Sequence, residues 1–147
     1  MSTAITTSRP IDRTQSSTAT FTTRWLEPSV AVITAQGDLD ASNAQEFVDY
    51  ALRGAQRTHR LALDLTGVDF FGTAGFSALH TLNVRCAGAG VEWVLVPSNA
   101  VSRLMRICDP DSTLPIAATM PAGLARLCAE QRRLLQLVSE PGQGFRQ

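Results

Sequence analysis

The stretch 61-LALDLTGVDFFGTAGFSALHTL-82 holds the transition that decides the fold of this chain. Residues 60–65 form an apolar run that is typical of a strand buried on both faces and therefore central in a sheet. The run passes through two phenylalanines into Gly72-Thr73-Ala74-Gly75, after which apolar residues recur at helical spacing. A buried strand leading into a helix predicts one unit of an α/β domain.

The same alternation continues on both sides of this stretch. Apolar, β-branched runs bounded by turn residues predict strands over residues 21–26, 30–36 and 91–96. Helices are predicted over residues 43–55, 73–87 and 99–107 and from residue 119 onward, with Ser42 or Asn43 as the N-cap of the first. Residues 113–117 can form only a short edge strand, because Pro115 has no amide proton. The order predicts an α/β domain with a mainly parallel mixed sheet of about five strands and about four helices.

The domain boundaries follow from composition. At 147 residues the chain is long enough for one domain. Residues 1–20 are crowded with Ser and Thr and almost lack large apolar side chains, which predicts a disordered tail. The folded domain is expected over residues 21–140, and residues 141–147 are expected to form a flexible tail.

The charge balance excludes several classes of function. Thirteen basic and thirteen acidic residues cancel, so no general attraction to nucleic acid or to an anionic membrane is expected. Every basic residue is arginine, which excludes mechanisms that need a lysine amine, such as a Walker A loop or a Schiff base. No apolar run approaches the roughly 20 residues of a membrane span. We therefore expect a cytoplasmic protein.

The cysteines and histidines do not form a recognisable catalytic or metal site. Cys86, Cys108 and Cys128 are odd in number, far apart and without a C-x-x-C pair, which predicts free and mostly buried thiols. A redox role for them stays open. His59 and His80 lack an obvious carboxylate partner in the sequence, and we expect His80 to lie on a helix face. No catalytic residue, cofactor or metal is predicted.

Thr73 is the residue around which a functional site is predicted. A threonine just before an apolar periodic run is typical of a helix N-cap, whose oxygen accepts from amides of the first turn. A phosphate on that hydroxyl would be stabilised by the free amides and the positive end of the helix. The small neighbours Gly72, Ala74 and Gly75 leave the hydroxyl open to an approaching partner.

Apolar residues flank the same loop. Phe70, Phe71 and Phe76 would supply anchors for a partner where they face outward, but at least two of the three are expected in the core. The helix that follows is expected to carry Leu79 and Val84 in its apolar set.

Three segments together resemble a known family. They are 37-GDLDASNAQEF-47, the 61–82 stretch and 91-VEWVLVPSNAVSRLMRICD-109. This pattern resembles a STAS domain, and more closely the bacterial anti-sigma factor antagonists, over residues from about 30 to 116. The resemblance implies a STAS-like fold whose two loops dock on an anti-sigma factor, a serine kinase of the GHKL type. That kinase phosphorylates the second loop and thereby releases the antagonist.

The resemblance also assigns residues. Thr73 matches the phospho-acceptor, Asp40 the aspartate of the first loop and Gly75 the glycine of the second. The implied partner-binding residues are Asp38, Asp40, Ser42, Gly72, Thr73, Ala74, Gly75 and Phe76. Two positions depart from the family: Gly72 stands in place of an aspartate, and Thr73 in place of a serine. Docking survives these changes more easily than phosphotransfer, because a β-branched secondary hydroxyl is more hindered.

Three hypotheses for function follow. The leading one is a non-enzymatic switch that binds an anti-sigma factor and frees a sigma factor. The second is a STAS docking subunit of a larger complex, such as a lipid-transport assembly, without phosphorylation. The third is a small enzyme that binds a phosphorylated ligand at residues 72–75. The oligomeric state is left open.

Overall fold

A five-stranded mixed sheet forms the centre of the molecule. The computed structural model describes residues 12–15, 18–26 and 29–139. The strands are β1 (Asp12–Gln15), β2 (Ala19–Leu26), β3 (Val30–Leu39), β4 (Arg60–Phe71) and β5 (Glu92–Pro97), and they lie in that order across the sheet. The pairs β1–β2 and β2–β3 are antiparallel, whereas β3–β4 and β4–β5 are parallel. The predicted α/β class with a mixed sheet is confirmed, although its antiparallel half is as large in pairings as its parallel half.

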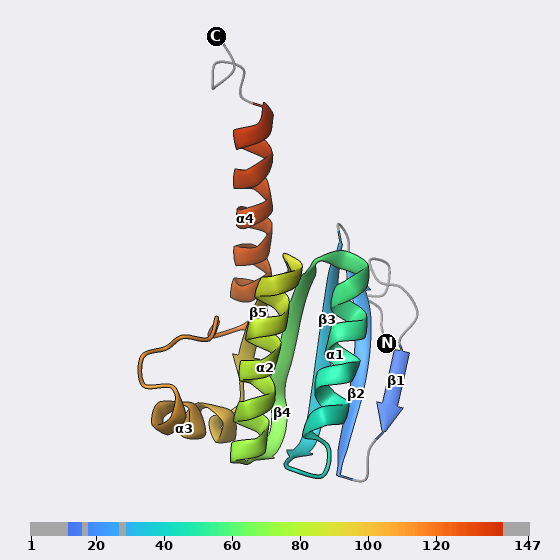
Figure 1. The fold of residues 1–147 in the computed structure, drawn as a ribbon, viewed down its shortest axis with the longest axis vertical. Helices are drawn as coiled ribbons and strands as arrows, with labels where there is room; N and C mark the ends of the chain where they lie inside the picture. Colours follow the sequence, from blue (N-terminus) through green and yellow to red (C-terminus); the bar gives the residue numbers. More distant parts are fainter. Residues whose placement is uncertain (1–11, 16–17, 27–28, 140–147) are drawn as a thin grey trace.

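Helices pack against both faces of the sheet, and two of them lie over the face that Figure 1 shows. They are α1 (Ala44–Thr58), α2 (Thr73–Ala89), α3 (Asn99–Cys108) and α4 (Met120–Ser139). The larger core joins one face of the sheet, through residues such as Ile33 and Leu63, to α1 and α2 and to Val101 of α3. The smaller core joins the opposite face to α4, where Leu127 packs against Val94 and its neighbours. Since alternate residues of β3, β4 and β5 enter different cores, these strands are apolar on both faces.

Two of the strands run further than the sequence pattern predicts. β3 continues past Gly37 to Leu39, and β4 continues past Leu65 to Phe71. The β3–β4 register shifts between Thr34 and Gln36 and again beyond Gly37, and each shift places an extra residue in β4. Such bulges interrupt the alternation of apolar and polar residues, so the pattern of residues 66–71 does not read as a strand.

The predicted disordered tail is wrong for part of residues 1–20. Asp12–Gln15 forms β1 and pairs with β2, which itself begins at Ala19. Threonine suits a strand, and pairing with β2 satisfies the backbone of this segment without a large apolar contribution. The remainder of that segment, residues 1–11 and 16–17, lies outside the described residues, as does the predicted tail over 141–147.

The remaining connections agree closely with expectation. Residues 113–117 contribute only an isolated parallel bridge between Ile116 and Leu95, consistent with the limit set by Pro115. Ser98 caps α3 by accepting from the amide of Val101. Among the helices of the described chain, none has the length and apolar character needed to cross a membrane.

Candidate functional site

The two loops singled out in the sequence lie side by side at one edge of the sheet. β3 and β4 are parallel neighbours, so their carboxyl ends meet at the same edge, and Leu39 pairs in register with Phe71. The amide of Gly72 donates to the carbonyl of Leu39 at 3.1 Å, which fixes the start of α2 against the end of β3. The β3–α1 and β4–α2 loops therefore lie next to each other at this edge of the sheet (Figure 1).

Thr73 is exposed at the mouth of α2. The prediction that Thr73 is the N-cap is wrong: Gly72, in an extended conformation, is the N-cap, and Thr73 is the first residue of the helix. The carbonyl of Gly72 accepts from the amides of Gly75 and Phe76 and so closes the first turn. Within the described part of the chain, the Thr73 hydroxyl takes part in no hydrogen bond, so it is available to a partner.

The β3–α1 loop is shaped by the carboxylate of Asp40. One of its oxygens accepts from the amide of Ser42 at 2.9 Å and from the Ser42 hydroxyl at 2.6 Å. Asp40 is half-buried and Ser42 exposed, while Asp38 is half-buried near the end of β3. The amide of Asp38 donates to the carbonyl of Thr18, which ties the loop to the segment before β2.

Asn43 supports the Asp40 loop through hydrogen bonds that the sequence did not predict. It occupies the N-cap of α1, as one of the two predicted candidates, but its side chain makes no capping bond to the helix. Its amide group instead donates to Thr18 Oγ1 at 2.9 Å and to the carbonyl of Asp38 at 2.8 Å, and its oxygen accepts from the amide of Asp40 at 3.0 Å. Asn43 is only 1% exposed, and hydrogen bonds in a buried, low-dielectric environment are stronger than those in water. It holds Asp40 in place.

The residues of the second loop divide into exposed and buried sets. Phe71 and Gly75 are buried, Phe76 is half-buried against the core, and Phe70 is 53% exposed beside Gly72. The expectation that at least two of the three phenylalanines belong to the core agrees with this. Gly75, which was expected to contact a partner, is buried, and its Cα faces the Phe71 ring. Its part is to let α2 sit close to β4.

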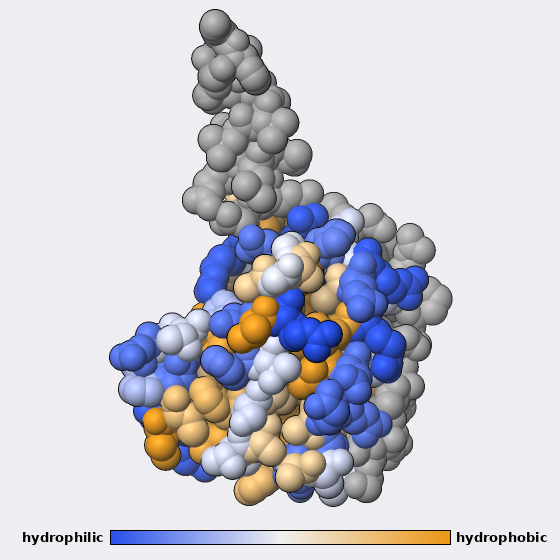
Figure 2. Space-filling view, viewed as in Figure 1, coloured by the Kyte–Doolittle hydropathy of each residue, from blue (hydrophilic) through white to orange (hydrophobic). Residues whose placement is uncertain are grey.

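An exposed stripe runs along α2 from the loop. Thr73, Ser77, His80 and Val84 recur at intervals of four, three and four residues, and all four are exposed. The prediction that Val84 belongs to the apolar set facing the core is wrong, since it is 57% exposed and Leu82 is buried instead. The expected position of His80 on a helix face is confirmed, and its ring stacks on Phe76 at 6.5 Å between centroids. Figure 2 shows that the surface over α1 is strongly hydrophilic, whereas the surface over α2 and α3 is more mixed.

Comparison with known proteins identifies the family. The sequence model of the STAS domain family matches residues 26–122, which include both loops and all of α2. The chain belongs to the STAS domain family. Its curated relatives include osmosensory protein A of Mycobacterium tuberculosis, 34% identical over 118 residues that cover 78% of this chain and 75% of that one. They also include the anti-sigma-F factor antagonist RsfA of the same species, 31% identical over 66% of this chain and 79% of that one.

Solved structures agree on the fold of this STAS domain. The crystal structure of an anti-sigma factor antagonist from Mycobacterium paratuberculosis superposes with a TM-score of 0.63 at 20% identity. The superposition covers 81% of this chain and 95% of that one. At this level of identity the comparison bears on the fold alone, and it confirms the STAS-like architecture implied by the loop motifs.

The position of Gly75 in the STAS domain yields a stability prediction with a matched control. A Cβ at Gly75 would lie 2.6 Å from a carbon of the Phe71 ring, whereas a Cβ at Gly88 of the same helix would meet nothing within 4 Å. We expect Gly75→Ala to destabilise by about 1–3 kcal/mol through overpacking. Gly88→Ala should instead stabilise by about 0.5–1 kcal/mol through helix propensity. Urea unfolding of both variants measures the difference, and equal effects would show that Gly75 is not a packing requirement.

The cysteines of the STAS domain differ in their environment. All three are free, with Cys86 buried and Cys108 and Cys128 half-buried. Burial raises the pKa of the Cys86 thiol to about 11, and the charge of Arg85 offsets only part of that rise. We expect a maleimide at pH 8 to label Cys86 at least about tenfold more slowly than the other two thiols, because the thiolate is the reactive form. Mass spectrometry of the labelled peptides measures this, and early labelling of Cys86 would contradict its place in the core.

Next to the α2 stripe, the end of α3 forms a hollow of about 350 Å³ lined by Phe76, His80 and Asp109. Asp109 is buried, and both its oxygens accept hydrogen bonds, from Thr113 and from the Leu114 amide. Burial alone would raise the pKa of this carboxyl, but those bonds and the nearby His80 hold the pKa below its usual value. Its contribution to stability is therefore present at neutral pH and is lost as the pH falls through that lowered pKa. Among the described residues, no group of His, Cys, Asp and Glu could hold a metal ion.

Proposed function

We propose that this STAS domain is an anti-sigma factor antagonist that acts as a binding module in the cytoplasm. Its docking surface consists of the β3–α1 loop with Asp40 and Ser42, the β4–α2 loop with Thr73, and the exposed stripe of α2. The observation that carries the proposal is the exposed, unengaged hydroxyl of Thr73 on a helix that is hydrogen-bonded to the end of β3. RsfA, the relative that is 31% identical to this chain, is an anti-sigma-F factor antagonist, which supports the proposal.

The mechanism is competition for the anti-sigma factor. When this domain occupies the anti-sigma factor, the sigma factor is free to act in transcription. Phosphorylation of Thr73 would add about −1.5 to −2 charges at the surface that the partner must cover. The added charge would be compatible with the helix mouth, where the first amides of α2 favour an anion. On docking, however, the phosphate on Thr73 would lose its hydration and would repel acidic groups of the partner, so the complex would dissociate.

The kinase is the anti-sigma factor itself in this proposal, of the GHKL serine-kinase type. Gly72 stands where the family has an aspartate, so the residue before Thr73 supplies no carboxylate. We expect this loss to slow phosphotransfer to Thr73 more than it weakens docking. A Cβ at residue 72 would lie 3.3 Å from the end of the exposed Phe70 ring, which is able to move. Gly72→Asp should therefore fold and should accelerate phosphotransfer to Thr73. Thr73→Val, which replaces the hydroxyl with a methyl group of similar size, is the control that should abolish phosphotransfer.

The test is affinity capture with this chain from its native cell, followed by intact-mass analysis. Recovery of an anti-sigma factor, and addition of one phosphate to the wild type but not to Thr73→Val when ATP is supplied, would support the proposal. Recovery of transporter subunits instead would support the docking-subunit hypothesis. Recovery of an anti-sigma factor without any phosphate would retain the antagonist function and reject Thr73 as an acceptor for that kinase.

A further inference from the structure

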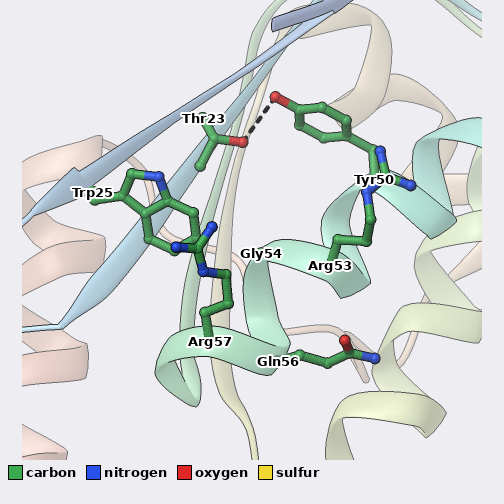
Figure 3. A pocket seen from close by; sticks show the side chains of 7 residues that line it. All are labelled: Thr23, Trp25, Tyr50, Arg53, Gly54, Gln56 and Arg57. Carbon is green, nitrogen blue, oxygen red and sulfur yellow. Dashed lines mark hydrogen bonds between the residues drawn. The ribbon is translucent and has the colours of Figure 1, made fainter. Parts of the chain in front are cut away.

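A second polar pocket lies between β2 and α1, at the opposite end of α1 from the Asp40 loop. It has a volume of about 300 Å³, at the lower end of the range for small-molecule sites. Figure 3 shows its side chains: Thr23 and Trp25 extend from β2, and Tyr50, Arg53 and Arg57 from α1. None of these residues takes part in the docking surface defined above.

The floor of the pocket is rigid and polar. Thr23 and Tyr50 are 3% and 4% exposed, and the Thr23 hydroxyl donates to the Tyr50 oxygen at 2.8 Å. Gly54 lies between the two arginines on α1, and a Cβ there would come within 2.9 Å of the Ile33 side chain. The absent side chain lets α1 pack close to the sheet.

Two guanidinium groups line the pocket, and each lies over an aromatic ring. The Arg57 guanidinium carbon lies 4.7 Å from the centroid of the Trp25 ring, and that of Arg53 lies 5.4 Å from the centroid of Tyr50. Stacking on an aromatic face engages the plane of a guanidinium and leaves its N–H groups in that plane free. Among the side chains that the structure describes, no carboxylate pairs with either arginine, and no acidic residue lines the pocket.

We propose that this pocket binds a small molecule carrying a phosphate group, held by Arg53 and Arg57. Arg53 and Arg57 are four residues apart, so their guanidinium groups lie on one face of α1 and line the same pocket. Each guanidinium can donate two parallel N–H···O hydrogen bonds to the oxygens of one phosphate group. Their combined charge matches a phosphate dianion. Stacking holds both side chains in place before binding, which lowers the ordering cost of the bound state. The exposed position of the arginines makes a weak, reversible site, as a sensor of a metabolite requires. The inference does not depend on the proposed function.

Nuclear magnetic resonance of the indole N–H groups tests the site directly. The chain has two tryptophans, so Trp25 reports on the pocket and Trp93 serves as an internal reference. Inorganic phosphate and phenyl phosphate are titrated at constant ionic strength. We expect a saturable shift of the Trp25 signal and a stationary Trp93 signal. Arg53→Gln and Arg57→Gln should each weaken binding by about tenfold or more, while the exposed control Arg103→Gln on α3 should change it by less than about twofold.

Three results would overturn the proposal. The first is a Trp25 signal that does not saturate with either phosphate. The second is an equal loss of affinity in Arg103→Gln, which would reveal general attraction of anions. The third is tighter binding of a hexaglutamate peptide than of phenyl phosphate, which would assign the groove to an acidic segment of a partner protein. Arg57→Lys keeps the charge without the fork, so it should also lose most of the affinity, and full retention would count against bidentate binding.

Discussion

Thr73→Glu is expected to weaken binding of the anti-sigma factor by about a hundredfold, since like charges and lost hydration at a covered surface cost several kcal/mol. The fold should stay intact. Thr73 is exposed at the first position of α2, where a negative charge stabilises a helix by about 0.3–1 kcal/mol. Titration calorimetry with the captured partner measures the affinity, and thermal unfolding measures the stability.

The matched control for this variant is Ala125→Glu. It adds the same side chain at an exposed position on α4, which packs on the opposite face of the sheet. We expect its affinity for the partner to equal that of the wild type. An unchanged affinity in Thr73→Glu would reject Thr73 as the switch. An equal loss in both variants would show that net charge, and not the position of Thr73, governs the complex.

Asn43→Ala is expected to lower the free energy of unfolding by about 2–4 kcal/mol, because it leaves buried polar groups without partners. The substitution removes both donors to Thr18 and Asp38 and the acceptor for the Asp40 amide. Binding of the partner should weaken as well, since the Asp40 loop loses the side chain that positions it. Urea unfolding gives the first quantity and calorimetry the second.

Asn99→Ala is the control for the same chemical change at an exposed site. Asn99 is the first residue of α3, where its side chain is exposed, and the cap of that helix is Ser98. Its substitution should change stability by less than about 0.5 kcal/mol. If Asn43→Ala proves as mild as Asn99→Ala, the bonds around Asn43 are not what fixes the loop.

The sequence pattern within each segment predicted most of the fold, because most strands and helices can be recognised from their own residues. β3 and β5 are β-branched runs, and the Ser98 side chain that caps α3 accepts from an amide only three residues away. The end of β4 was missed because its bulges exist only relative to β3, and a neighbouring strand is invisible to a pattern read along one segment. Within this end of β4, Phe70 faces out and Phe71 faces in, because successive residues of a strand point to opposite faces.

The site was predicted in outline but not in its internal support. Exposure of Thr73 follows from small neighbours and a following helix, both of which are local. Gly72 is the N-cap of α2 because its extended backbone lets its carbonyl accept from the amides of the first turn. A residue without a side chain gives no capping signal in the sequence. The bond from Asn43 to Thr18 joins residues 25 apart, and only the assembled sheet brings them together.

The central claim is that one surface, made of the β3–α1 loop, the mouth of α2 and its exposed stripe, meets the anti-sigma factor. Hydrogen–deuterium exchange of this chain, alone and with the captured partner, tests that claim most directly. We predict slower exchange over residues 39–44 and 72–76 in the complex, with no change over 120–129 of α4. Protection confined to α4, or exchange in both loops that the partner leaves unchanged, would contradict the account.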